Sequence, residues 1–175
     1  MFKISFKETS IPCKVVFKEG RKTTVTYRGI IMLPKLWWYM PPEIRRWINH
    51  CSYVDICENI ATNTAIIYAR GIARCREDDK YDTLLGERIA EARSKYNMYR
   101  FIAELCKKLM LYYNNWMYDV PALPSIGSTV VALDAGQYKH VKGGLFGDYT
   151  KYMALMNKEI EHIEALLNAN RDGKE

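Results

Sequence analysis

The chain of 175 residues predicts an α+β fold, in which a small antiparallel sheet with an N-terminal hairpin is packed by helices and followed by a C-terminal helical pair. Apolar and polar residues alternate along residues 2–28, as on strands with one buried face. A β-branched, apolar run fills residues 64–75 and predicts a central strand. Further along, apolar residues recur every three or four positions, which is helical spacing.

The N-terminal hairpin is predicted from alternation on both sides of a glycine turn. Residues 2–7 and 13–17 each alternate with period two, and residues 22–28 repeat the pattern after Glu19-Gly20-Arg21. A glycine accepts the positive φ that a tight turn needs. We therefore expect three strands in one sheet.

The faces of these strands are predicted from the same alternation. We expect Cys13, Val15 and Phe17 to face the core together with Val25 and Tyr27. The outer face would then be a basic surface for binding nucleic acid or a partner, made of Lys3, Lys7, Lys14, Lys18, Lys22 and Arg28.

An aromatic cluster follows the hairpin. Trp37 and Trp38 could lend stacking planes to the same binding surface, or pack beneath the sheet. Prolines suit the first turn of a helix, so a short helix is expected over residues 42–50. Its apolar side would leave Arg45 and Arg46 on the opposite side, where they join the candidate binding residues.

Residues 76–118 predict helix after the central strand. Asp79 and Asp82 are expected to cap the first turn, where carboxylates satisfy free N–H groups. Gly86 and Ala90 lie one turn apart and would let this helix approach the sheet closely. Farther on, a seam with 4-3-4-3-4 spacing contains Met98, Ile102, Leu105, Leu109, Tyr112 and Trp116.

The domain organisation follows from these elements. We expect one domain, with an α+β core and its basic sheet over residues 1–118 and a connector rich in glycine and proline over 119–147. Residues 148–175 would form an amphipathic helix. Its apolar residues suit either an intramolecular helical pair or a homodimer, and the candidate oligomerisation residues are Tyr149, Met153, Met156, Ile160, Ile163 and Leu167.

Positive charge is concentrated at the N-terminus. The net charge is +6, yet residues 1–50 alone contain 10 basic and 3 acidic residues. Such a region favours phosphate or an acidic protein surface as a partner, although solubility is the plain alternative. No apolar run approaches the about 20 residues that cross a bilayer, and no signal peptide is recognised. We therefore expect a cytoplasmic protein that does not enter a membrane.

The sequence predicts no enzyme, cofactor or metal site. The five cysteines form no CxxC pair, and His50-Cys51 followed by Cys57 lacks a second pair of zinc ligands. Neither a Walker motif nor a dinucleotide fingerprint is present. A weaker alternative is a metal-dependent nuclease, because hard carboxylate ligands cluster at Glu77, Asp78, Asp79 and Asp82.

One segment is similar to known proteins. It consists of a strand ending in Ala-x-Cys, an acidic turn, and Gly-x-x-Ile-Ala-x-Ala-Arg on a helix, and its matching residues are Ala73, Cys75, Asp78, Asp82, Gly86, Ala90 and Arg93. This pattern resembles a segment of small phage and mobile-element proteins, and the match covers residues 71–95 of the chain. The resemblance implies a mobile-element origin and no particular activity.

Two classes of function remain. The first is a binding protein for nucleic acid or a nucleoprotein such as a CRISPR effector. With the mobile-element resemblance, its natural form is an inhibitor of a host defence nuclease, of the anti-CRISPR kind. The second is an assembly protein whose C-terminal helices pair between chains. The charge asymmetry favours the first class.

Overall fold

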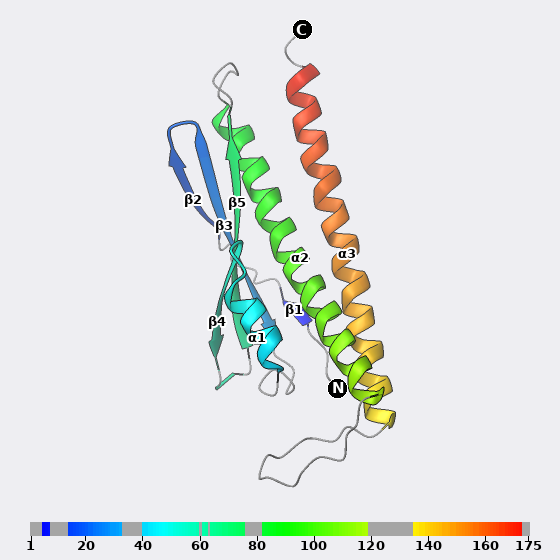
Figure 1. The fold of residues 1–175 in the computed structure, drawn as a ribbon. Coiled ribbons are helices and arrows are strands. Elements are labelled where there is room, and N and C mark those ends of the chain that lie inside the picture. Colours follow the sequence, from blue (N-terminus) through cyan, green and yellow to red (C-terminus); the bar gives the residue numbers. More distant parts are fainter. Residues whose placement is uncertain are drawn as a thin grey trace.

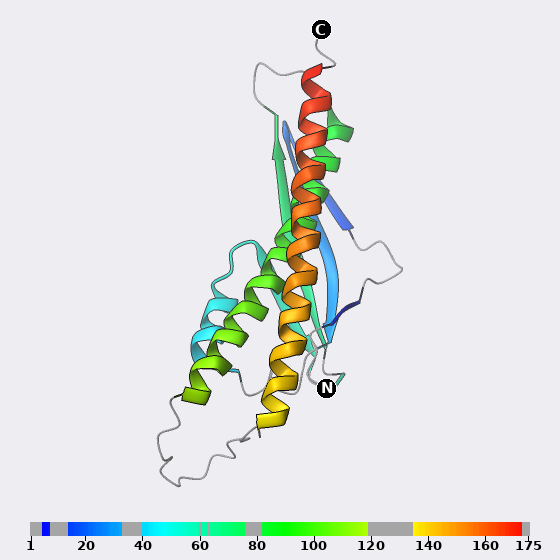
Figure 2. The same cartoon turned by 90° about the vertical axis from the view of Figure 1, so that its right-hand side faces the viewer.

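A computed structural model describes residues 5–7, 14–32, 40–59, 61–62, 64–75, 82–118 and 135–172. It contains an antiparallel sheet and three helices, which confirms the α+β class. A long helix, α2 (Thr83–Tyr118), lies against one face of the sheet, and α3 (Ala135–Asp172) lies alongside α2 (Figures 1 and 2). Among the described elements, none covers the other face of the sheet (Figure 1).

The sheet contains the predicted hairpin and the predicted central strand. Its strands are β1 (Ser5–Lys7), β2 (Lys14–Glu19), β3 (Lys22–Met32), β4 (Val54–Asn59) and β5 (Thr64–Arg74). Every pairing is antiparallel in the order β1-β3-β5-β4, and β2 also pairs with β3. Gly20 turns the hairpin with φ of +54°, a conformation that glycine adopts without steric cost.

The predicted faces of β2 are wrong. Residues directly opposite each other in an antiparallel pair share a face, and Lys14 lies opposite Tyr27 while Lys18 lies opposite Thr23. Both lysines therefore stand on the face that α2 covers, and Val15 stands on the uncovered face. The predicted faces differ from the structure by one residue, because Val15, Val16 and Phe17 offer apolar residues to both faces.

Two short elements connect β3 to β5. Helix α1 (Pro42–Asn49) begins at a proline, as predicted, and its apolar side buries Ile44 and Ile48. Strand β4 was not predicted, although Val54 and Ile56 alternate with Asp55 and Cys57. Asp55, Glu58 and Asn59 are residue types that strands disfavour, and pairing with β5 overrides that preference.

Helix α2 begins at its acidic cap. The Asp82 carboxylate accepts hydrogen bonds from the N–H groups of Leu84 (2.8 Å) and Leu85 (3.0 Å). Asp79, the other expected cap, lies outside the described residues. The close approach of helix and sheet is confirmed, but it depends on Gly71 of β5, where an added Cβ would lie 2.0 Å from the carbonyl oxygen of Ala90.

Helix α3 begins at Ala135, so the expected start near Asp148 is wrong. Residues 135–147, assigned to a glycine-rich connector, are helical. Glycine costs about 1 kcal/mol per residue in a helix, but Leu145 and Asp148 are buried at this point. Burial of Leu145 in the core offsets that cost, which the local sequence could not show.

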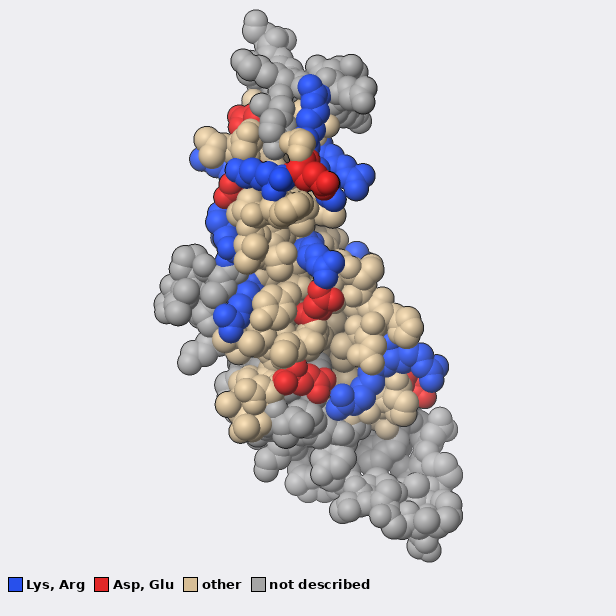
Figure 3. Space-filling model, turned by 90° about the vertical axis from the view of Figure 1, so that its left-hand side faces the viewer, with Lys and Arg blue, Asp and Glu red and all other residues tan. Residues whose placement is uncertain are grey.

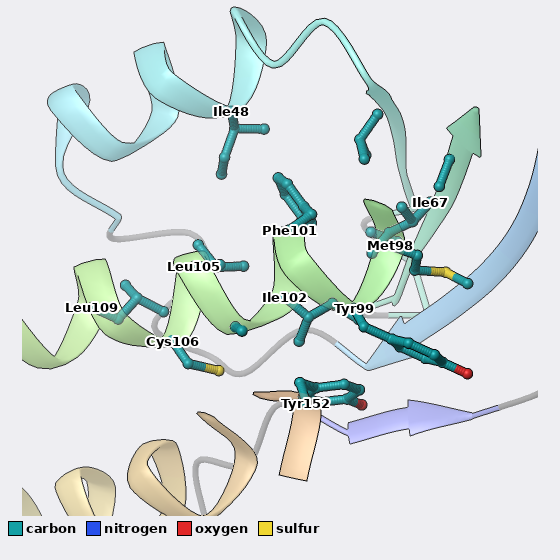
Figure 4. Packing of buried hydrophobic residues seen from close by; sticks show 14 of the residues in the cluster. Ile48, Ile67, Met98, Tyr99, Phe101, Ile102, Leu105, Cys106, Leu109 and Tyr152 are labelled. Atoms are coloured by element: carbon teal, nitrogen blue, oxygen red, sulfur yellow. The ribbon is translucent and has the colours of Figure 1, made fainter. Parts of the chain in front are cut away.

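The main core lies where α1, α2, α3 and β5 meet. Phe101 and Ile102 of α2 are completely buried, and the ring of Phe101 stacks on Trp47 of α1 with centroids 5.2 Å apart. Ile67 of β5 lies near one side of α2, and Tyr152 of α3 lies beneath Tyr99 (Figure 4). In the described part of the chain, no helix combines the length and apolarity needed to cross a membrane.

Candidate nucleic-acid interface

The uncovered face of the sheet, called here the outer face, is built from rows of opposed residues. Lys22 lies opposite Arg74, and Thr26 lies opposite Arg70. Arg28 lies opposite Tyr68, on the same face. Figure 3 shows this side of the molecule, where Lys and Arg side chains are distributed among uncharged side chains, with some Asp and Glu side chains beside them.

The cations of the outer face differ in their partners. Arg70 forms an ion pair with Asp55 of β4. For Lys22 and Arg74, no carboxylate lies within ion-pairing distance among the described residues. These two side chains are therefore available to an anion from solvent.

An apolar band lies between the basic rows. Val15 and Phe17 of β2 are 70% and 60% exposed, and Ile72 of β5 is 39% exposed. The register places Phe17, Thr24 and Ile72 in one row across three strands, and Val15 in the next row beside Thr26. Exposed large apolar side chains gathered on one face mark an interaction surface.

Two kinds of group thus stand side by side on a rigid support. The apolar band can accept the flat face of a base or an apolar side chain, while Lys22 and Arg74 can accept phosphate or carboxylate oxygens. Because β2, β3 and β5 form one sheet, their backbone hydrogen bonds hold these groups at a fixed spacing. The face fits an extended ligand that combines planar groups with negative charge.

Lys14 and Lys18 serve a different purpose. Lys14 Nζ lies 2.8 Å from Glu91 Oε2 and 3.2 Å from Glu87 Oε1, and Lys18 Nζ lies 3.3 Å from Glu87 Oε2. Hydrogen bonds from Lys14 and Lys18 lower the pKa of the Glu87 carboxyl, and those to Glu91 and Glu87 raise the pKa of Lys14. The two lysines attach β2 to α2, so their predicted outward placement is corrected.

The remaining predicted binding residues are scattered. Arg45 Nη1 lies 3.4 Å from Glu58 Oε1, and Arg46 is exposed on α1. Lys7 belongs to β1, but its side chain lies outside the described residues, as do Lys3, Trp37 and Trp38. Arg70 and Arg74 were not predicted, although both lie at alternate positions of the run 64–75 and so point to one face.

The predicted oligomerisation seam is used largely within the chain. Tyr149, Met153 and Met156 pack against the main core, which α2 also lines. Ile160 and Leu167 remain 36% and 38% exposed at the C-terminal end of α3. The intramolecular pair of the two alternatives is therefore present, and dimerisation stays a prediction.

The cysteine and acidic clusters show no metal centre among the described residues. His50 Nδ1 lies 2.7 Å from the carbonyl oxygen of Arg46, and burial raises the pKa of the neighbouring Cys51 thiol. The Tyr53 hydroxyl, which is hydrogen-bonded to Cys51, donates to Glu104. Glu77, Asp78 and Asp79 lie outside the described residues, whereas Asp82 caps α2.

Comparison with known proteins adds no family. Neither a family model, nor a curated protein, nor a solved structure matches the chain. The binding surface is therefore identified from the outer face itself.

Proposed function

We propose that this chain is a non-enzymatic binding protein whose outer face engages single-stranded nucleic acid. The observation that supports the proposal is the apolar band of Val15, Phe17 and Ile72 beside Lys22 and Arg74, which form no ion pair with a described residue. Unpaired bases stack on aromatic side chains, and phosphates bind lysine and arginine. A duplex would hide its bases from this flat face, so a single strand is the better fit.

The biological form that we propose is an inhibitor of a nucleic-acid-targeting defence nuclease. This form rests on the resemblance of residues 71–95 to mobile-element proteins and on a binding surface that needs no catalytic residue. Such a protein would occupy the single strand that the nuclease must bind, or bind the nucleoprotein that holds it.

The test is the fluorescence anisotropy of labelled single-stranded DNA, single-stranded RNA and duplex DNA with purified protein at two salt concentrations. We expect both single strands to bind more tightly than the duplex. The double variant Lys22→Glu/Arg74→Glu should lose at least about tenfold in affinity, since two phosphate contacts become repulsive. Its matched control is Lys107→Glu/Lys158→Glu, which changes the net charge equally at exposed helix positions.

Stacking is tested separately from charge. Phe17→Ser should weaken single-strand binding several-fold, because a base stacked on an aromatic ring contributes about 1–3 kcal/mol, and leave the salt dependence unchanged. Equal binding by the outer-face and control charge variants would exclude the outer face as the site. Cleavage of any strand with added Mg²⁺ or Mn²⁺ would instead support the nuclease alternative.

A further inference from the structure

Strand β5 extends beyond the end of its neighbour β4. The β4–β5 ladder ends where Val54 lies opposite Ala69, whereas β3 accompanies β5 as far as Arg74. Residues 70–74 therefore have β3 on one side and no described strand on the other. An uncovered strand edge is a template on which another extended segment can pair.

The backbone groups at this edge can be assigned from the hydrogen bonds around it. Cys75 N–H donates to the Arg21 carbonyl on the β3 side, and Arg70 N–H donates to the Tyr53 carbonyl on the opposite side. The backbone N–H and C=O groups of successive residues point to opposite sides of a strand. Ile72 and Arg74 therefore direct their N–H and C=O groups away from β3. Among the described residues, no acceptor faces either N–H group.

Two side chains of α2 donate hydrogen bonds to backbone carbonyls at this edge. Arg93 Nη1 donates to the carbonyl oxygen of Ile72 at 2.5 Å, in the position that a neighbouring strand's N–H would occupy. Asn97 Nδ2 donates in the same way to the carbonyl of Arg70 at 2.7 Å. The carbonyls of Arg70 and Ile72 thus accept hydrogen bonds from side chains. Each is a single hydrogen bond from one flexible side chain, so the N–H group of an added strand can replace it.

A groove of about 620 Å³ runs along the same edge. It is bounded by Arg70 and Ile72 of β5, by Tyr96 of α2, and by Ile160 and Ile163 of α3. This volume is ample for the side chains of an extended peptide. The exposed surface of the groove is mainly apolar, so it favours apolar side chains from an occupant.

Charge at the edge favours an acidic partner. Among the described residues, neither Arg74 nor Arg93 forms an ion pair, and Arg93 donates a hydrogen bond to the Ile72 carbonyl. One acid, Glu164, lines the groove. A residue paired with Ile72 would place its side chain on the outer face, next to Arg74 and to Arg70, of which Arg70 is already paired with Asp55.

We propose that the edge of β5 over residues 70–74 binds an extended segment of a partner protein by strand addition. The segment alternates apolar residues, which enter the groove against Tyr96, Ile160 and Ile163, with acidic residues on the outer face. The N–H group of the segment residue opposite Ile72 replaces Arg93 as the donor to the Ile72 carbonyl. Carbonyl groups of the segment accept hydrogen bonds from the N–H groups of Ile72 and Arg74. This site shares Ile72 and Arg74 with the proposed nucleic-acid site but differs from it in its apolar wall, which belongs to the helices.

The probe is an octapeptide of alternating valine and glutamate, added to the full chain. Amide hydrogen exchange measured by NMR should slow at Ile72 and Arg74 when the peptide binds. The residue opposite Ile72 is a glutamate, so N-methylation at the glutamates should abolish binding. N-methylation at the valines, the matched control, should leave binding within about threefold because those N–H groups face away from β5.

Protein variants test the groove. Ile163→Glu should weaken peptide binding at least about tenfold and leave single-strand affinity unchanged. Leu167→Glu, on the same helix but outside the groove, should leave both the peptide affinity and the single-strand affinity unchanged. Thermal unfolding of both variants confirms that they fold.

Three outcomes would overturn the proposal. The first is no protection of the Ile72 and Arg74 amides at about 1 mM peptide. The second is equal binding by the two N-methylated peptides. The third is that these amides become protected in the absence of peptide, to an extent that increases with protein concentration. That result would identify a second copy of the chain as the occupant.

Discussion

The two faces of the sheet carry similar residue types and use them in opposite ways. On the inner face, Lys14 and Lys18 bind the carboxylates of α2, and Val25 is completely buried. On the outer face, Lys22 and Arg74 have no carboxylate partner among the described residues, and Val15 is largely exposed. Basic and apolar side chains thus stabilise the fold on the inner face, whereas on the outer face the same types of side chain are accessible to a ligand.

This difference shows that charge along the sequence does not by itself define a binding surface. The N-terminal excess of lysine and arginine is divided between the faces, and α2 neutralises its inner share through Glu87 and Glu91. The outer share is completed by Arg70 and Arg74, which come from β5. The binding surface is therefore assembled from two regions of the chain.

The largest expected effect is at the inner face, where Gly71→Ala should destabilise the protein by about 3 kcal/mol or more. The new Cβ would meet backbone atoms of α2, 2.0 Å from Ala90 O and 2.3 Å from Ser94 N, so the helix must move off the sheet. Urea unfolding measures the effect. The control Gly147→Ala, in open space on α3, should be neutral or slightly stabilising.

A matched pair of valines compares the faces directly. Val25→Ala should cost about 2 kcal/mol, because it leaves a cavity beside Ala90 and Ile89. Val15→Ala should change the free energy of unfolding by less than about 0.5 kcal/mol, because that side chain is already exposed. Equal losses in urea unfolding would mean that the outer face is covered in solution.

The ion pairs of the inner face should make stability depend on pH. The lowered pKa of Glu87 means that its contribution is complete above its ordinary pKa of 4.5 and is lost as pH falls through the lower, folded value. The raised pKa of Lys14 means that its contribution is complete below 10.5 and is lost at still higher pH.

We therefore expect Lys14→Gln/Lys18→Gln to cost about 1 kcal/mol at neutral pH. The variant should also lose part of the acid-induced fall in melting temperature below pH 4.5. Melting curves at a series of pH values provide the measurement. If the melting temperature of the variant falls below pH 4.5 as much as that of the unchanged protein, these pairs do not attach β2 to α2 in solution.

The smallest effect is expected for the corresponding outer-face variant. Lys22→Gln/Arg74→Gln should alter stability by less than about 0.5 kcal/mol, since neither side chain has an ion pair to lose among the described residues. The same variant should lower the salt dependence of single-strand binding by about 1.4 in the log–log slope. A large loss of stability would place these cations in the structural group with Lys14.

Local patterns predicted most of the elements. The glycine turn at Gly20, the apolar run of β5, and the proline start of α1 each contain their own signal within a few residues. Strand β4 and the first turns of α3 were missed, because their stability comes from partners distant in the sequence. For the candidate site, Lys22 and Arg28 were predicted, whereas Arg70 and Arg74 were not.

The amino-acid sequence by itself determined the α+β class, the hairpin, the long helices and the excess of positive charge. Those properties follow from periodicity and composition, which each segment expresses locally. Only the tertiary structure decided which face each side chain of β2 takes, because a shift of one residue in register exchanges the faces. That register places Lys14 against α2 and leaves Phe17 exposed beside Thr24, where a ligand can reach it.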